Sequence, residues 1–288
     1  MINAAALLLA ATVPFHGVFV ELEHAENVCR SDARVVIIAN IVGYGEGCSP
    51  CRKFEKAATV LEVMPKETEV YVGLVYEANF ESDKATKAQL QNAWREDRDV
   101  AIQFLDYLKE RKIDRRPNGW YLAREVHNFD DLEQRKLIRD EYLEPAADAL
   151  PDFGAVLIAP YFVTGCDGSA TLKATETGAM FAELVKNTKI THLLLQDGFS
   201  ARFDHLCDTK LSNYTKAAER YEQKIAEAVR AEGVQFWIDM EVFDYKEPAE
   251  VARIKKQRKI VPPNTPIVAY RYDDCRAKKL NAAVCPER

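Results

Sequence analysis

The stretch VQFWIDMEV (Val234–Val242) sets the pattern from which the fold can be predicted. It is a short and almost continuous apolar run, which is typical of a strand buried on both faces of a parallel sheet. Seven other short runs rich in apolar and β-branched residues are spaced along the chain: Gly17–Leu22, Arg34–Ile41, Glu69–Val75, Asn118–Arg124, Gly154–Tyr161, Thr191–Gln196 and Pro266–Tyr270. The sequence therefore predicts eight strands.

Helical stretches separate most of these strands. We expect them at Pro50–Val63, Lys84–Lys112, Asp130–Leu150, Ala174–Asn187, Lys210–Glu232, Pro248–Lys259 and Asp274–Val284. Strands that alternate with helices predict an α/β fold with a parallel sheet. Eight such units in 288 residues predict a single (β/α)8 barrel of the TIM type, which typically takes about 250 residues. The first connection, His24–Ala33, is too short for an ordinary crossover, so we expect its helix to be missing or reduced to one turn.

The barrel domain is expected to span residues 17–288, after an N-terminal segment of residues 1–16. That segment contains MINAAALLLAATV (Met1–Val13), which resembles the apolar part of a signal peptide but lacks a basic start. It is either an export signal or a helix that closes the bottom of the barrel. The seven cysteines favour an oxidising compartment, so a periplasmic or secreted location is the expectation, with a cytoplasmic one left open.

Composition excludes several classes of function. The net charge is -6 and no basic stripe is visible, which argues against binding to nucleic acid. The basic run Arg253–Lys259 is interpreted as the solvated face of a helix. No apolar stretch approaches the roughly 20 residues that a membrane span needs. Neither a glycine-rich phosphate loop nor a zinc-binding spacing is present, so we expect no metal and no cofactor.

A barrel of this type places its active site at the carboxyl ends of its strands. Glu125 follows the fourth expected strand, and Glu241 lies near the end of the seventh. Because side chains alternate along a strand, Asp239 and Glu241 share one face, as do Tyr121 and Glu125. We therefore expect the two glutamates to face each other across the mouth as catalytic residues. Other polar and aromatic residues at strand ends are the expected substrate contacts: Asn40, Tyr76, Tyr161, Gln196, Asp197, Phe199 and Asp239.

Two glutamates in this arrangement suit glycoside cleavage. One carboxylic acid protonates the leaving oxygen, while the other carboxylate attacks the anomeric carbon or activates a water. Nearby aromatic rings would stack on sugar faces, and Asn, Gln and Asp would bond to hydroxyl groups. The expected partner is thus a poly- or oligosaccharide. The same pocket in a barrel without catalytic activity would bind glycans without cleaving them, and this alternative stays open.

Several stretches resemble the motifs of one family. They are YVGLVYE (Tyr71–Glu77), GWYLAREVHN (Gly119–Asn128), VLIAPYF (Val156–Phe162), HLLLQDGFS (His192–Ser200) and FWIDMEVFD (Phe236–Asp244). Together they are similar to a bacterial group known as domain of unknown function 4434, over about Gly17 to Lys259. The resemblance implies a glycoside-hydrolase-like barrel with Glu125 and Glu241 as acid/base and nucleophile. Barrel glycosidases of that type usually carry Asn directly before the acid/base, whereas this chain has Arg124.

A competing signal comes from GCSPC (Gly47–Cys51), which follows an apolar strand and precedes an expected helix. A C-x-x-C motif in that context resembles the active site of a thioredoxin, where the helix N-terminus lowers the pKa of the first thiol. A thiol–disulfide oxidoreductase that uses Cys48 and Cys51 is therefore a less favoured alternative. A small disulfide that braces the loop is the simpler interpretation.

Overall fold

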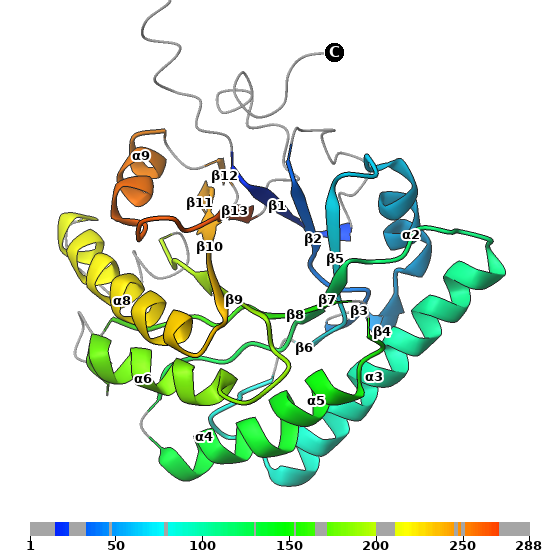
Figure 1. Ribbon diagram of the computed structural model, residues 1–288, viewed down its shortest axis with the longest axis horizontal. Helices are drawn as coiled ribbons and strands as arrows, with labels where there is room; N and C mark the ends of the chain where they lie inside the picture. Colours follow the sequence, from blue (N-terminus) through cyan, green and yellow to red (C-terminus); the bar gives the residue numbers. More distant parts are fainter. Residues whose placement is uncertain are drawn as a thin grey trace, which may run out of the picture.

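The computed structural model describes residues 15–22, 33–45, 48–77, 80–129, 131–152, 154–164, 172–199, 211–244, 247–248 and 251–270. Its centre is a closed barrel of eight parallel strands, seen in Figure 1. The strands are β1 (Gly17–Val20), β2 (Val35–Ile38), β5 (Glu69–Gly73), β7 (Gly119–Leu122), β8 (Ala155–Ile158), β9 (His192–Gln196), β10 (Gln235–Glu241) and β13 (Ile267–Tyr270). They lie in chain order, and β13 pairs with β1 to close the barrel. The predicted (β/α)8 fold and all eight expected strands are confirmed.

Helices surround the barrel on its outer side (Figure 1). They are α2 (Phe54–Val63), α3 (Lys87–Glu110), α4 (Leu132–Ile138), the π-helical turn η2 (Arg139–Leu143), α5 (Glu144–Ala149), α6 (Ala174–Val185), α8 (Leu211–Ala231) and α9 (Val251–Ile260). Six of the expected helices are confirmed by these segments, with somewhat shorter bounds. The expected segments at residues 1–14, 23–32 and 274–284 lie outside the described residues, so the short first connection, the nature of the N-terminal segment and the last helix remain predictions.

A small second sheet was not predicted. It consists of β3 (Val42–Gly45), β4 (Cys48–Arg52) and β6 (Val75–Glu77), in the order β4-β3-β6. β3 and β4 form an antiparallel hairpin, and β6 pairs in parallel with β3. Since β3 follows β2 and β6 follows β5, this sheet extends the barrel wall beyond the carboxyl ends of the second and third barrel strands. A second small hairpin, β11 (Phe243–Asp244) with β12 (Glu247–Pro248), follows β10.

The hairpin corrects the interpretation of the C-x-x-C motif. Cys48 and Cys51 lie in strand β4, and α2 begins only at Phe54 instead of Pro50. A helix N-terminus that would activate the thiol of Cys48 is therefore not adjacent to it. The local structure that the thioredoxin alternative assumed, a helix that begins at the motif, was therefore wrong. The side chains of both cysteines lie outside the described part of the structure, so a disulfide between them stays a prediction.

Two apolar cores follow from the alternation of side chains along the strands. One core fills the barrel interior, with Phe19, Ile37, Tyr71, Tyr121, Leu157, Leu194, Trp237 and Val268 among its members. The other lies between the sheet and the helices and includes Trp120, whose indole donates a hydrogen bond to the carbonyl of Pro151. Trp120 and Trp237 thus lie on opposite sides of the barrel wall. Above the interior core, the same alternation sends inward-facing side chains into the mouth of the barrel.

Candidate active site

The first part of the site links the ends of β7 and β9. Glu125 is half-buried and lies three residues beyond β7, in phase with Tyr121 and Ala123 of the barrel interior. The amide of Gln196 donates to Glu125 Oε1 at 3.1 Å and to the carbonyl of Ala159 at 2.9 Å. Glu125 and Gln196, which were both expected at strand ends, are thus in direct contact.

Tyr161 lies between these two strand ends. Isolated bridges pair it with His127 on one side and with Gln196 on the other, so the parallel ladder continues past β8. The phenol ring of Tyr161 stacks on the imidazole of His127, with ring centres 5.1 Å apart. Glu125, Tyr161 and Gln196 therefore form a contiguous polar and aromatic wall at the carboxyl ends of β7, β8 and β9.

The second part of the site holds the backbone of Glu241. Glu241 is the last residue of β10 and is 4% exposed. Its backbone N–H donates to Asp197 Oδ1 at 3.1 Å. Gln257 Nε2 donates to Asp197 Oδ2 at 2.7 Å and to the carbonyl of Glu241 at 3.2 Å. The backbone N–H and the carbonyl of Glu241 are thus held by two buried side chains, Asp197 directly after β9 and Gln257 in α9.

These contacts change the expected role of two residues. Asp197 is only 1% exposed, and both of its carboxylate oxygens accept hydrogen bonds within the protein. Phe199 is also 1% exposed and packs edge-on against Tyr214, which donates from its hydroxyl to the carbonyl of Asp197 at 2.9 Å. Asp197 uses both carboxylate oxygens within the protein, and Phe199 is packed against Tyr214, so both side chains support the segment around Glu241. The expectation that they contact substrate directly does not fit this geometry.

The charges of Glu125 and Glu241 both act on one buried carboxyl group, that of Asp239. Asp239 is 2% exposed and faces the barrel interior one step below Glu241. Burial raises its pKa well above the ordinary value, and the negative charges of Asp197, Glu241 and Glu125 raise it further. Burial, together with the charge of Glu241, raises the pKa of Asp197 to about 7. Its surroundings therefore favour the protonated form of Asp239, which lies below Glu125 and Glu241.

The remaining expected contacts lie on the β2–β5 side of the barrel. Asn40 follows β2, is partly exposed, and donates from its side chain to the carbonyl of Val42 at 3.0 Å. Tyr76 lies in β6, pairs with Gly43 of β3, and is 40% exposed. Both remain accessible to a ligand, although neither is linked to Glu125 or Glu241 by a contact that the described residues show.

Four residues of this region were missed by the sequence analysis. Tyr270 ends β13 directly beside Glu241, and its position at a predicted strand end could have identified it. Gln257 and Arg253 are buried on one face of α9, and the positive charge of Arg253 acts on Asp197. Glu222 of α8 is 1% exposed, and burial raises its pKa well above the ordinary value, as does the charge of Asp197. The run Arg253–Lys259 is therefore not simply a solvated face.

Within the described ranges, no group of three or more His, Cys, Asp or Glu side chains is arranged to hold a metal ion. No described helix combines the length and the apolar character needed to cross a membrane.

The fold is a closed (β/α)8 barrel, and Glu125 and Glu241 lie at or beyond the carboxyl ends of two of its strands. The chain belongs to the family described as Domain of unknown function (DUF4434), whose model matches residues 52–282. No protein of curated function matches the sequence.

Solved structures with the same fold include enzymes that act on polysaccharides. A fungal beta-1,4-galactanase is similar with a TM-score of 0.50 and 9% identity, over 98% of this chain and 91% of that one. A GH5 cellulase from an Icelandic hot spring isolate is similar with a TM-score of 0.50 and 12% identity, over 90% of this chain and 76% of that one. At such identities the likeness shows the fold alone.

Proposed function

We propose that this protein hydrolyses glycosidic bonds of a poly- or oligosaccharide through Glu125 and Glu241. The proposal is supported by the position of Glu125 and Glu241 at or beyond the carboxyl ends of β7 and β10, and by the charges of both, which raise the pKa of the buried Asp239. Two carboxyl groups that flank one space can provide the acid and the nucleophile or base of glycoside cleavage. No cofactor enters the proposed reaction.

The two glutamates are held in ways that suit different roles. Glu125 is half-buried and oriented by the side-chain amide of Gln196, so it can reach a leaving oxygen as the general acid/base. Glu241 is almost fully buried on a backbone that Asp197 and Gln257 fix, so it can serve as the nucleophile or as the base. Fixed carboxylates of this kind lower the barrier because little reorganisation is needed during the reaction.

Substrate contacts are assigned to the accessible groups of the mouth. Tyr161, Gln196 and Tyr270 lie beside the two glutamates, and Asn40 and Tyr76 extend the surface along the small second sheet. Aromatic rings can stack on sugar faces, and amides can bond to hydroxyl groups. Because the galactanase and the cellulase share the fold, β-1,4-galactan and cellulose oligosaccharides are the first substrates to try.

The test is the release of reducing ends from a glycan panel that includes these two classes. Wild-type protein is expected to cleave at least one of them. Glu241→Gln is expected to lose at least about a hundredfold in kcat while its circular dichroism and unfolding midpoint stay near the wild type. Glu62→Gln, on the exposed surface of α2, is the matched control and should keep full activity. Full activity of Glu241→Gln would contradict the proposed mechanism.

Glycan binding without cleavage is the alternative outcome of the same panel. Arg124 stands before Glu125 where barrel glycosidases usually have Asn, which is the feature of this chain that favours the alternative. Titration calorimetry on glycans that are not cleaved separates the two functions. Binding that Glu241→Gln leaves intact, with no hydrolysis by wild type, would replace the proposal with a glycan-binding role.

A further inference from the structure

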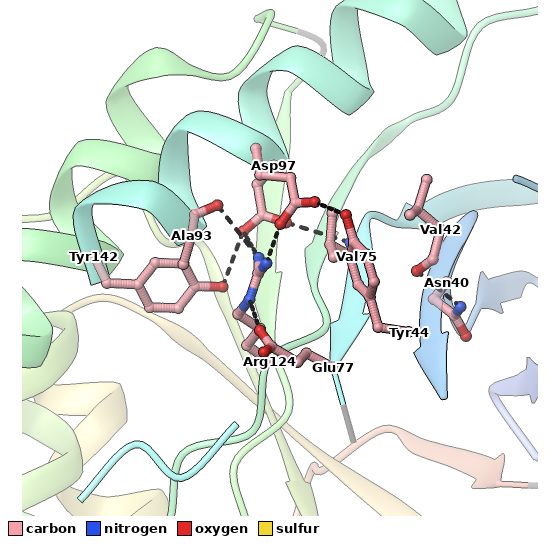
Figure 2. Close-up of polar contacts among 10 residues, drawn as sticks. Asn40, Val42, Tyr44, Val75, Glu77, Ala93, Asp97, Arg124 and Tyr142 are labelled. Atoms are coloured by element: carbon pink, nitrogen blue, oxygen red, sulfur yellow. Dashed lines mark hydrogen bonds and ion pairs between the residues drawn. The ribbon is translucent and has the colours of Figure 1, made fainter. Parts of the chain in front are cut away.

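Arg124 and Glu125 are neighbours in sequence that point to opposite sides of the barrel wall. Glu125 faces the mouth, whereas the side chain of Arg124 faces α3 and is only 1% exposed. Figure 2 shows the guanidinium of Arg124 surrounded by oxygen atoms from α3 and β6. An arginine buried this deeply needs hydrogen-bond partners on several sides, since its charge cannot be removed at physiological pH.

Asp97, Glu96 and the carbonyl of Ala93 lie within hydrogen-bonding distance of the guanidinium, and Glu77 adds an ion pair at longer range. Arg124 Nη1 lies 3.0 Å from Asp97 Oδ2 and donates to the carbonyl of Ala93 at 3.3 Å. Nη2 lies 2.6 Å from Glu96 Oε2, and Nε lies 3.6 Å from Glu77 Oε2. The fork geometry of the guanidinium is what allows one side chain to bind α3 and β6 at once.

Asp97 extends these contacts to two further elements. It is completely buried, and its Oδ1 accepts from the backbone N–H of Val75 at 3.3 Å. Its Oδ2 accepts from the hydroxyl of Tyr142 at 3.1 Å, and Tyr142 lies in the π-helical turn η2. π-Helical turns inside helices often mark functional positions. Asp97 thus connects Val75, the first residue of β6, with the helical turn η2 that carries Tyr142.

A last contact reaches the small second sheet. The hydroxyl of Tyr44, in β3, donates to Glu96 Oε1, while Glu96 Oε2 binds Arg124. We call the set Tyr44, Glu77, Glu96, Asp97, Arg124 and Tyr142 the Arg124 cluster. Through it the extensions of β2 and β5 are connected to the end of β7, which is where Glu125 begins to face the mouth (Figure 2).

The backbone around Glu125 needs such support. The last residue of β7 is Leu122, so Glu125 lies past the regular strand. On the far side, the N–H of Tyr161 donates to the carbonyl of Val126 at 3.0 Å. Arg124 fixes the chain immediately before Glu125, and the Tyr161 bond fixes it immediately after. A shift of this segment by an ångström would move the Glu125 carboxyl away from Gln196.

We propose that Arg124 is a positioning residue that holds Glu125 in its catalytic orientation by binding Asp97, Glu96 and Glu77 behind the barrel wall. The inference rests on the proposed function and adds to it a residue that never touches the substrate. It also accounts for an arginine at a position where barrel glycosidases usually have an amide. Here the side chain faces α3, and Gln196 supplies the amide to Glu125 from β9.

Arg124→Lys is the decisive variant, because it keeps the positive charge but cannot bind the three carboxylates together. We expect kcat to fall at least tenfold with KM changed less than threefold, since the substrate contacts remain. Tyr44→Phe removes one bond at the rim of the cluster and should give a smaller loss of kcat. Arg115→Lys is the control: Arg115 binds the backbone carbonyls of Met64 and Thr68 near the start of β5, at the opposite end of the barrel.

A second measurement does not depend on activity. Amide hydrogen exchange followed by NMR reports on two bonds between β7 and β8: Tyr161 N–H to Val126, and Ala155 N–H to Asn118 at the other end of the strands. Positioning by Arg124 predicts that Arg124→Lys accelerates exchange at Tyr161 at least tenfold more than at Ala155. A general loss of stability would accelerate both amides equally.

The two readouts separate the proposals. With an active wild type, the expected result is the loss of kcat together with selective exchange at Tyr161, and any other combination overturns the positioning role. With a wild type that cleaves no glycan, the proposed function fails, and the ratio of exchange at Tyr161 and Ala155 alone decides whether Arg124 holds the Glu125 segment.

Discussion

Asp197 shows how a carboxylate at a strand end can serve the backbone and not a ligand. Each of its oxygens accepts a hydrogen bond inside the protein, from Glu241 and from Gln257. The position at the end of β9 is the one that sequence reasoning assigns to a substrate contact. Whether such a residue faces the mouth or the protein interior depends on its packing against other elements, here α9 and Tyr214. The sequence of β9 alone gives no information about that packing.

Protonation of Asp197 predicts a pH dependence of stability. Its pKa is raised to about 7 in the folded protein from an ordinary value of 3.8, so the folded state binds a proton that the unfolded state has released between these pH values. The stability from this group is complete below about pH 4 and is lost as pH rises through about 7. Asp197→Asn removes the titration and keeps an acceptor for the N–H of Glu241.

Urea unfolding at pH 5 and pH 8 measures this effect. One pKa unit corresponds to about 1.4 kcal/mol. The difference in free energy of unfolding, Asp197→Asn minus wild type, should therefore be more than about 1 kcal/mol larger at pH 8 than at pH 5. Parallel changes in both proteins would show that Asp197 does not titrate in this range.

At the scale of elements, α9 completes the site from outside the barrel. Arg253, Ile254, Gln257 and Ile260 are buried, whereas Lys255, Lys256 and Lys259 are exposed. The buried positions recur at helical spacing, so the sequence contains the pattern of a helix with one face packed against the protein. The basic character of the run hid it, because a buried Gln or Arg is recognised only when its partners, here Asp197 and Glu241, are known.

Gln257→Ala tests the contribution of this helix. The variant removes the donor that Gln257 supplies to Asp197 Oδ2 and to the carbonyl of Glu241, which costs about 1–3 kcal/mol. We also expect kcat to fall because the backbone of Glu241 is released. Lys256→Ala, at the exposed neighbouring position, should change neither quantity. Equal behaviour of the two variants in unfolding and kinetics would contradict the role assigned to α9.

The elements also show where prediction from sequence ends. Each barrel strand was found because strands buried on both faces are continuous apolar runs. The small sheet of β3, β4 and β6 was missed because its strands are short and include Gly43, Gly45 and Pro50, which weaken a strand pattern. Its pairing joins residues far apart in the chain, and no local signal announces that.

Closure of the barrel brings together the residues of the candidate site, which are far apart along the chain. Glu125 and Glu241 are 116 positions apart in numbering, and β8 and β9 separate their strands in the sheet, yet both act on Asp239. Alternation along strands predicted which side chains face inward once a barrel was assumed, and the pairing of Glu125 with Glu241 in catalysis stays a prediction. The supports behind the pair, from Arg124 on one side and Gln257 on the other, depend on helices packed outside the barrel.

The most direct test of the proposed catalysis is the leaving-group dependence of Glu125→Gln. An acid catalyst is needed most when the leaving group is poor, so the variant should lose at least about a hundredfold in kcat/KM on an unactivated oligosaccharide. It should lose less than about tenfold on a dinitrophenyl glycoside of the same sugar, whose leaving group needs no proton. Equal losses on both substrates, or wild-type rates on both, would contradict the assignment of Glu125 as the acid of a glycoside hydrolase.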